Sequence, residues 1–320
     1  MFPPVEPFSS GMLTVEDGNQ LYWEVSGNPA GKPAVHLNGG PGAGTRSGYR
    51  RRFDPDRYLV VGFDQRGCGR SRPLVTDDLG TLSRNTTQAL VADLESLRQH
   101  LGIDRWLLAG VSWGTTLAIA YAQAHPQRVS EMVLAAVALT TPDYVDWITE
   151  GVGALFPQAW EKFEAASGRR PGQRLVDAYH QLLLHPEPDV RARAALDWAA
   201  WEDAHISLDP HWRPAPPEDD PTRWQVMATL VTHYWSHAGF LPPEVLVGDL
   251  GRLSAIPTTI VHGRYDVSGP IGHAWALHRA LPGSTFIEIE DEGHGGPQMM
   301  AAVAGATTAF ARNLSSPASG

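Results

Sequence analysis

The sequence has a single cysteine, Cys68, among its 320 residues. One cysteine permits no internal disulfide and no zinc site built on several thiolates. The N-terminal residues 1–8 carry neither a positively charged region nor an apolar core, so they do not form a secretory signal. No apolar run is long enough to cross a bilayer. Together these absences predict a soluble, cytoplasmic protein.

Positive charge is also scarce. Lysine and arginine number 25 against 35 acidic residues, which gives a net charge of −10, and no basic run is present. Nucleic acid and anionic membrane are therefore not expected as partners. The oligomeric state is left open by the sequence. The hydrophobic fraction of 42% is ample for a sizeable core, in one large domain or in one domain with an insertion.

The segment Gly110-Val111-Ser112-Trp113-Gly114 is the most informative stretch of the chain. The apolar run before it, residues 106–109, is typical of a buried strand, and residues 115–122 are typical of a buried helix. A Gly-x-Ser-x-Gly pentapeptide between a strand and a helix predicts a nucleophile elbow, a sharp turn with the serine hydroxyl exposed at its apex. Because the chain is rich in glycine, the pentapeptide alone would also be consistent with chance.

Strands and helices alternate around this segment. Residues 11–26 predict a hairpin, and residues 85–101 predict a helix that Asn85 can cap. Further strands are expected at 33–38, 58–63, 129–137, 258–262 and 284–290, and a helix at 270–281. This order predicts an α/β protein of the α/β-hydrolase type, with a mostly parallel, eight-stranded-type sheet and helices on both faces.

Between residues 139 and 246 the pattern changes. Strand-like runs disappear, and short helical stretches and a proline cluster take their place. Seven of the eleven tryptophans lie here, at positions 147, 160, 198, 201, 212, 224 and 235. Most are expected to serve packing, although an apolar substrate pocket would also need several. We therefore predict a core domain of residues 1–138 and 247–320 and a helical cap domain of residues 139–246 inserted into it.

A glycine-rich loop, residues 39–44, follows the strand at 33–38. A loop of this kind can cradle phosphate, but its spacing fits neither the P-loop nor the dinucleotide-binding fingerprint. The better interpretation is an oxyanion-hole loop, because α/β hydrolases take one donor from the loop after an early strand and one from the residue after the nucleophile. The predicted donors are the backbone N–H groups of Gly40 and Trp113.

A catalytic triad follows from the order of the remaining motifs. In α/β hydrolases the serine is followed along the chain by an acid and then a histidine, each after a strand. Ser112, Asp266 and His294 satisfy this order. Ser112 would be the nucleophile, His294 the base that takes its proton, and Asp266 the group that holds the imidazole.

Other polar residues are assigned to structure. Asp64 and Arg66, in the loop after the strand at 58–63, are expected to form a buried Asp–Arg network, and Cys68 lacks the local signature of a catalytic thiol. His233 and His237 have the spacing of zinc ligands on a helix, but no glutamate stands between them as in His-Glu-x-x-His. We therefore expect no metal and no cofactor.

Over nearly its whole length the chain resembles the prolyl aminopeptidase (proline iminopeptidase) family of the α/β-hydrolase superfamily. The resemblance rests on residues 39–42, 64–71, 85–87, 101–106, 110–117, 261–266 and 293–294. It implies removal of an N-terminal residue, typically proline, without a metal. It also implies that carboxylates of the cap hold the free amino group of the substrate. Trp198-Ala-Ala-Trp201-Glu202 resembles the family's Trp-Glu element, so Glu202 would pair with the ammonium group.

Three positions depart from the family pattern. Asn38 replaces a histidine, and residues 139–142 lack an arginine that the family often carries there. Val231, ahead of His233 and Tyr234, stands where the family has a second amine-binding glutamate. The pocket would thereby lose a charge and gain apolar surface. The residues expected to contact substrate are Glu202, Trp201, Val231 and Tyr234.

These observations predict a serine aminopeptidase that removes proline or another small N-terminal residue from a small peptide or an aminoacyl amide. An aminoacylated secondary metabolite is an alternative substrate. A carboxylesterase or thioesterase on the same scaffold is an alternative activity, and it would not need Glu202. A non-catalytic, hydrolase-like binding protein is the alternative of another class, which the complete triad disfavours.

Overall fold

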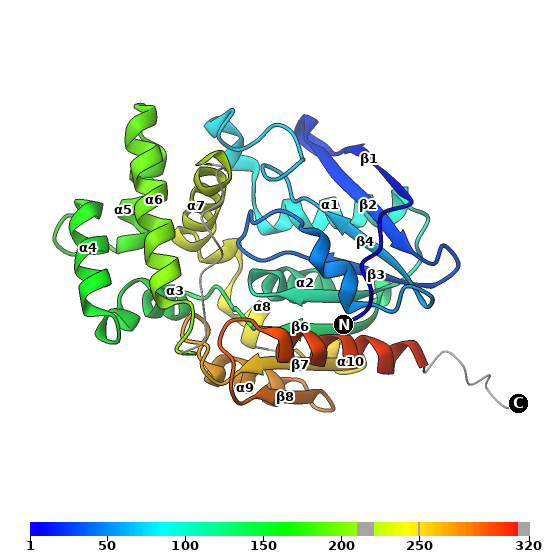
Figure 1. The fold of residues 1–320 in the computed structure, drawn as a ribbon. Helices are drawn as coiled ribbons and strands as arrows, with labels where there is room; N and C mark the ends of the chain where they lie inside the picture. The colour runs from blue at the N-terminus through cyan, green and yellow to red at the C-terminus, as the bar shows by residue number, and fades with distance from the viewer. Residues whose placement is uncertain (210–220, 249, 313–320) are drawn as a thin grey trace, which may run out of the picture.

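The computed structural model describes residues 1–209, 221–248 and 250–312. Its centre is a sheet of eight strands in the order β1-β2-β4-β3-β5-β6-β7-β8 (Figure 1). The strands are β1 (Ser9–Thr14), β2 (Gln20–Gly27), β3 (Lys32–Leu37), β4 (Tyr58–Phe63), β5 (Trp106–Val111), β6 (Val129–Ala135), β7 (Thr258–Gly263) and β8 (Thr285–Ile289). The pairs β1–β2 and β2–β4 are antiparallel, and all other neighbouring pairs are parallel. The predicted, mostly parallel eight-stranded sheet is confirmed.

Helices cover both faces of the sheet, because successive strand residues point to opposite sides. In β5, Trp106 and Leu108 face one core, and Leu107 and Ala109 face the other. The helices α1 (Thr87–His100), α2 (Trp113–Ala124) and α9 (Ile271–Ala280) contribute to the first core, and α10 (Pro297–Arg312) contributes to the second. Strands buried on both faces explain why the sequence shows continuous apolar runs instead of strict alternation.

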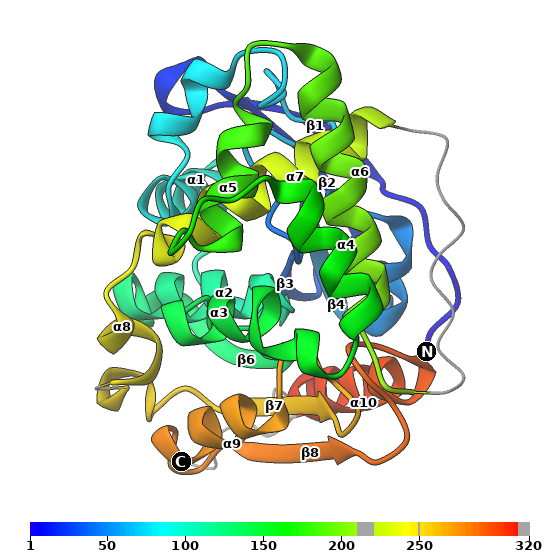
Figure 2. The same cartoon turned by 90° about the vertical axis from the view of Figure 1, so that its left-hand side faces the viewer.

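A layer of helices stands over one end of the sheet, between β6 and β7 in the chain (Figures 1 and 2). Its members are α3 (Pro142–Thr149), α4 (Pro157–Ser167), α5 (Leu175–Leu183), α6 (Pro188–His205) and α7 (Pro221–Ser236), whereas α8 (Pro243–Val247) packs against α2 and α9. Aromatic packing holds the layer together: the Phe163 ring stacks on Tyr179 at 4.4 Å and on Trp201 at 5.1 Å. Trp212 lies outside the described residues. The division of the chain into a core and a cap domain stays a prediction.

The start of α1 differs from the expectation by one residue. The side chain of Thr86, not that of Asn85, caps the helix by accepting a hydrogen bond from the N–H of Ala89 at 3.3 Å. The Asn85 amide is instead used between loops and helices: it donates to the carbonyl of Arg66 and accepts from the Tyr234 hydroxyl at 2.7 Å. Asn85 thereby ties α7 to the sheet layer.

The loop after β4 contains buried ion pairs, although the pairing differs from the expected one. Arg66 binds both carboxylate oxygens of Asp93, at 2.6 and 2.7 Å. Asp64 pairs with Arg70 at 2.9 Å and also accepts the N–H of Thr45. Asp64 and Arg66 therefore belong to two different pairs. Cys68 is buried in the same loop, and burial raises the pKa of its thiol, as expected for a structural cysteine.

None of the described helices combines the length and the apolar composition that a bilayer crossing would require.

Candidate active site

Ser112 stands at the turn between β5 and α2, with φ 55° and ψ −128°. A residue with a side chain rarely adopts this conformation, so the surrounding structure must enforce it. The neighbouring glycines permit the turn. A Cβ at Gly110 would lie 2.5 Å from the carbonyl oxygen of Gly114, and a Cβ at Gly114 would lie 2.2 Å from that of Leu37. Only glycine fits at both positions.

Three predicted residues form one hydrogen-bonded series. His294 Nε2 lies 2.8 Å from Ser112 Oγ, and His294 Nδ1 lies 2.8 Å from Asp266 Oδ2. Asp266 follows β7 and His294 follows β8, so strand ends that meet at one edge of the sheet bring the side chains together. Because a carboxylate can only accept, Nδ1 carries the proton, which leaves Nε2 free to accept the Ser112 proton.

Electrostatics favour this arrangement. Burial by itself raises the pKa of Asp266, but the attraction of His294 and its hydrogen bond outweigh burial and leave that pKa lowered. Burial lowers the pKa of His294, yet its attraction to Asp266, the hydrogen bond and the charge of Glu202 leave it raised. The Asp266 carboxylate is thus held ionised, and the imidazolium that forms when His294 takes a proton is stabilised.

Gly40 and Trp113, whose backbone amides are the predicted oxyanion donors, border the same cavity as Ser112. Trp113 is the first residue of α2, so its N–H has no partner within the helix. Gly40 adopts φ 106°, and a Cβ there would lie 2.8 Å from the nitrogen of Gly42. Within the described chain neither amide donates to another backbone carbonyl. Both residues line the cavity that contains Ser112 and His294, and their role as oxyanion donors stays a prediction.

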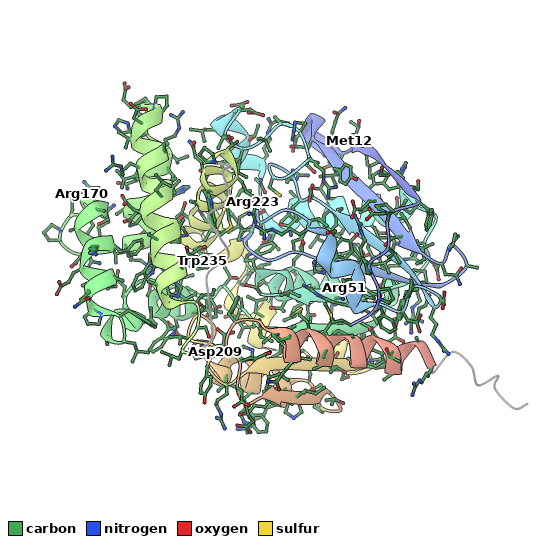
Figure 3. The ribbon with its side chains drawn as sticks, viewed as in Figure 1. Met12, Arg51, Arg170, Asp209, Arg223 and Trp235 are labelled. Atoms are coloured by element: carbon green, nitrogen blue, oxygen red, sulfur yellow. The ribbon has the colours of Figure 1, made fainter. Side chains whose placement is uncertain are left out.

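That cavity has a volume of about 220 Å³ and lies between the sheet and the helical layer. Its walls are mainly apolar, with Ile148 from α3 and Met227 and Trp235 from α7. Figure 3 shows Trp235 at the boundary between the two layers. An enclosed, mostly apolar cavity with a few polar groups suits a small ligand.

Glu202, near the end of α6, is the carboxylate that the helical layer places in this cavity. Its Oε1 accepts a hydrogen bond from the Trp198 indole at 2.7 Å. Burial raises the pKa of Glu202 to about 7, and the nearby Asp203 adds to the rise, whereas Trp198 and His294 oppose it. A carboxylate so poised gains most from a cationic partner, which would favour its ionised form.

The other three residues predicted to contact substrate do not line the cavity. Trp201 is buried, with its indole donating to the carbonyl of Ile148 at 3.2 Å. Val231 is 1% exposed, inside the packing of α7. Tyr234 packs edge-to-face on Trp113 and donates to Asn85. All three side chains are packed among buried neighbours. Val231 lies four residues from both Met227 and Trp235, so it shares their face of α7, but its own side chain is not part of the cavity wall.

The sequence reasoning missed several polar neighbours of Asp266. Gly269 N–H donates to Asp266 Oδ1 at 2.8 Å, and the Gly269 carbonyl is in turn held by His262 Nε2 at 2.6 Å. His205 and Ser268 also line the cavity, and His205 Nδ1 lies 3.1 Å from Ser268 Oγ. The sequence did not indicate that His262 holds the Gly269 loop, because a histidine inside an apolar strand is typical of an ordinary core residue.

Asn38, one of the departures from the family pattern, packs the loop. Its amide donates to Thr45 Oγ1 at 2.6 Å and to the carbonyl of Phe63 at 3.2 Å. Gln65 donates to the Asn38 carbonyl. The side chain therefore joins the loop after β3 to the loop after β4, beneath the residues that line the cavity.

Comparison with known sequences identifies the family to which this site belongs. A family model described as the alpha/beta hydrolase fold matches residues 35–296. The chain is 45% identical over 305 residues to a probable proline iminopeptidase of Streptomyces coelicolor, with 92% of each chain covered. It is 41% identical over 297 residues to a proline iminopeptidase of Neisseria meningitidis serogroup B, with 92% of this chain and 93% of the relative covered.

Solved structures agree on the fold. A proline iminopeptidase of Mycobacterium smegmatis superposes with a TM-score of 0.61 at 19% identity, covering 96% of this chain and 100% of the other. An esterase of Exiguobacterium antarcticum superposes with a TM-score of 0.59, also at 19% identity, covering 95% of this chain and 100% of the other. The predicted α/β-hydrolase fold is confirmed, and with relatives above 40% identity over most of its length the chain belongs to the proline iminopeptidase family of α/β hydrolases.

Proposed function

We propose that this chain is a serine aminopeptidase that removes an N-terminal proline, or another small residue, from small peptides. The observation that carries the proposal is the hydrogen-bonded series from Ser112 through His294 to Asp266, which opens into a cavity that also holds Glu202. The names of the relatives, proline iminopeptidases, point to the same chemistry. The reaction needs no cofactor.

The first half of the reaction is acylation. His294 Nε2 takes the proton of Ser112 Oγ while that oxygen attacks the carbonyl carbon of the N-terminal residue. The N–H groups of Gly40 and Trp113 would donate to the oxyanion of the tetrahedral intermediate. A donor of this kind contributes about 10²–10³ in rate. Asp266 stays ionised and stabilises the imidazolium.

His294 then gives its proton to the leaving amine, the C–N bond breaks and an acyl-enzyme on Ser112 remains. A water molecule, deprotonated by the same imidazole, attacks the acyl carbon and releases the free amino acid. The proton returns to Ser112 Oγ, which restores the starting state.

Substrate selection is assigned to Glu202 and the apolar walls. An N-terminal ammonium group entering a partly dry cavity needs an opposite charge, and Glu202 is placed to supply it. The apolar walls formed by Ile148, Met227 and Trp235 suit the methylene groups of the proline pyrrolidine ring. Val231 does not line the cavity, so the geometry favours recognition of the amine by Glu202 without a second carboxylate at that position.

The broader assignments belong to the same proposal. We infer a cytoplasmic enzyme with a core of residues 1–138 and 247–320 and an inserted cap of residues 139–246. The long run of helices between β6 and β7 supports the cap. Small peptides are the proposed substrates, and aminoacylated small molecules would share the same acyl end.

Steady-state kinetics on the p-nitroanilides of proline and alanine, beside p-nitrophenyl acetate, test the proposal. The proline anilide should be cleaved fastest. A fluorophosphonate probe should label the wild type and fail to label Ser112→Ala. Cleavage of the ester alone would replace the proposal with an esterase, and a wild type that the probe does not label would point to a non-catalytic binding protein.

A further inference from the structure

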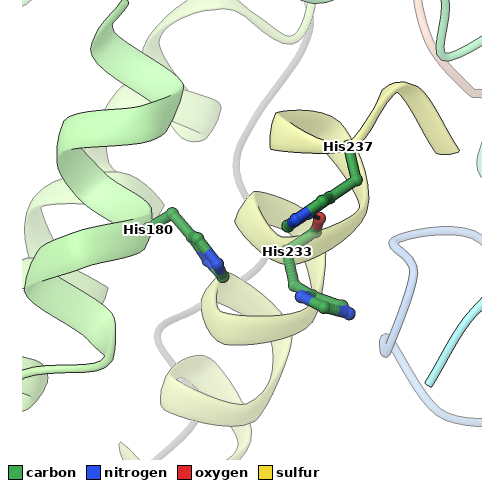
Figure 4. A group of neighbouring side chains, drawn as sticks. All are labelled: His180, His233 and His237. Atoms are coloured by element: carbon green, nitrogen blue, oxygen red, sulfur yellow. Dashed lines mark hydrogen bonds between the residues drawn. The ribbon is translucent and has the colours of Figure 1, made fainter. Parts of the chain in front are cut away.

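Three histidines gather in the helical layer, away from the Ser112 cavity (Figure 4). His180 comes from α5, His233 from α7, and His237 from the turn directly after α7. One ring nitrogen of each lies within 4.8 Å of those of the other two. Within the described part of the chain, this is the one group of three or more side chains suited to hold a metal ion. The sequence pattern showed only His233 and His237, since His180 is more than fifty residues away.

The protonation of two rings is set by backbone carbonyls, which can only accept. His233 Nε2 lies 3.0 Å from the carbonyl of Asn85, so it carries the proton and Nδ1 keeps its lone pair. His237 Nδ1 lies 2.7 Å from the carbonyl of His233, so Nε2 keeps its lone pair. Metal-binding histidines characteristically donate their other ring N–H to a backbone carbonyl or a carboxylate in this way.

The third ring, His180, has a buried Nδ1 that has no hydrogen-bond partner within the described part of the chain. A buried polar atom is normally paired, so the unpaired Nδ1 of a ring beside two other histidines is a candidate metal ligand. Figure 4 shows the His180 ring extending from α5 toward His233 of α7 and His237 in the turn after it. Phe240 stacks on the His237 ring at 4.8 Å and packs on His233 at 5.0 Å, which limits the freedom of both rings.

Charge and access also suit a cation. Burial lowers the pKa of His180 to about 4, and repulsion by His233 and His237 adds to the effect. Burial also lowers the pKa of His233 to about 4, against the hydrogen bond to the Asn85 carbonyl, which raises it. The lone pairs that the backbone hydrogen bonds leave on His233 Nδ1 and His237 Nε2 are the groups that a metal ion binds. His237 is exposed, so the site opens to solvent on its side and a water molecule can complete the coordination.

We propose that His180, His233 and His237 form a binding site for a divalent transition-metal ion of the zinc type, with water as the fourth ligand. Three neutral imidazoles suit Zn²⁺, Co²⁺, Ni²⁺ and Cu²⁺ better than Mg²⁺ or Ca²⁺, which take oxygen ligands. Tetrahedral Zn–N bonds of about 2.0–2.1 Å place the ligand nitrogens about 3.4 Å apart, so the rings must close on the ion by small side-chain rotations.

Such an ion would join α5 to α7. Trp235, which lines the Ser112 cavity, lies between His233 and His237 in the sequence, and His233 and Tyr234 both contact Asn85 in the sheet layer. The site would therefore stabilise the helical layer without taking part in the reaction. The inference is independent of the proposed aminopeptidase activity.

The test is a titration of the full chain, freed of metal by a chelator, with Zn²⁺ in a calorimeter and with Co²⁺ in a spectrophotometer. We expect one ion per chain, visible Co²⁺ bands of a tetrahedral site, and a rise in the thermal unfolding midpoint on addition of Zn²⁺. His180→Gln and His237→Gln should each weaken binding at least about 100-fold, since even loss of an outer hydrogen-bond partner costs about 10–100-fold.

His100→Gln is the matched control, because His100 is an exposed histidine on α1, outside the cluster. It should bind Zn²⁺ as the wild type does. The circular-dichroism spectrum and the thermal unfolding midpoint, both measured without metal, report whether each variant is folded, and His237→Gln decides the question if His180→Gln is not. A wild type that binds no Zn²⁺, or cluster variants that bind as tightly as the wild type, would overturn the proposal.

Discussion

The active-site cavity is built from two regions: the carboxyl ends of the strands, here called the sheet edge, and the helical layer. The two regions hold their side chains in place in different ways. At the sheet edge, Ser112 follows β5 directly, Asp266 and His294 lie in the loops after β7 and β8, and the two hydrogen bonds that join the three side chains each measure 2.8 Å. In the helical layer, Glu202, Met227 and Trp235 come from two helices that pack through aromatic side chains. The sheet thus determines the reacting atoms, and the helices determine what reaches them.

This difference matters for evolution of the fold. Strand ends are held by the backbone hydrogen bonds of the sheet, so a catalytic geometry placed there tolerates changes elsewhere. A side chain on a packed helix moves whenever its neighbours change size. The solved relatives at 19% identity, among them both an esterase and a proline iminopeptidase, share the fold of this chain. We expect substrate preference to depend on the helical layer and the acyl-transfer step to depend on the sheet edge.

The largest effect is expected from Asp266→Asn. Asp266 accepts the Gly269 N–H through Oδ1 and the His294 Nδ1–H through Oδ2. Asparagine has only one acceptor oxygen, so its NH₂ group would face His294 and force the wrong tautomer. Turnover of both anilide and ester should fall about 10⁴-fold, as measured by kcat. The thermal unfolding midpoint serves as control, and a loss below about tenfold would contradict the assignment.

The contrast between the two regions also explains what the sequence could reveal. The elbow, the order Ser112, Asp266, His294 and all eight strands follow from local signals: glycine spacing, apolar runs and turn residues. Glu202 was identified only through the family resemblance, because a carboxylate on a mixed helix carries no local signal. Helix α6 has polar and apolar residues distributed around its axis, so its sequence does not show which face is buried.

Val231 and Tyr234 were predicted to contact substrate and do not line the cavity, which again shows that the sequence does not determine the packing of the helical layer. Their position beside a family motif predicted contact with substrate. Tyr234 is turned about 100° from its neighbour Trp235, which lines the cavity, whereas Val231 shares the face of Met227 and Trp235 but is only 1% exposed. The His180 contact with α7 was beyond the sequence for a related reason. It depends on how two helices pack, and no spacing along the chain encodes that.

Glu202→Gln should separate the two regions functionally. Loss of the carboxylate leaves the substrate ammonium unpaired in a partly dry cavity, and breaking such a pair costs about 3–5 kcal/mol, or about 10²–10⁴-fold in kcat/KM. Cleavage of p-nitrophenyl acetate, which has no ammonium group, should change little. Asp203→Asn is the matched control, because Asp203 is the adjacent exposed carboxylate on α6 and does not line the cavity. Equal losses on anilide and ester would contradict the role of Glu202.

Val231→Glu tests whether the position that differs from the family can contact substrate. Val231 is 1% exposed, so a carboxylate there would be buried without a partner. We expect a loss of about 2–4 kcal/mol in the free energy of unfolding, measured by urea denaturation, and no gain on the proline anilide. Val231→Ile controls for a simple change of volume. A variant that is stable and cleaves the proline anilide faster would show that the side chain does reach the amine.

The smallest expected effect is a shift in the pH dependence of kcat/KM in Glu202→Gln. This shift measures directly the electrostatic influence of the helical layer on the sheet edge. His294 must be neutral to take the Ser112 proton, so kcat/KM for the ester rises as pH increases through the His294 pKa. Burial lowers that pKa, while Asp266 and then Glu202 raise it, and the net result is a rise. Glu202→Gln removes one of the charges that favour the imidazolium. The rise in activity should therefore move to lower pH in the variant and stay in place in Asp203→Asn.

The ester is the right substrate for this measurement, because it lacks an amine and its binding does not depend on Glu202. The kcat/KM profile reports the free enzyme, in which the helical layer and the sheet edge interact only through their own charges. If the profile of Glu202→Gln coincides with that of the wild type, the Glu202 carboxylate does not influence His294. The two regions would then act on the substrate separately. If the profile moves as expected, binding of an ammonium group to Glu202 must itself alter the basicity of His294.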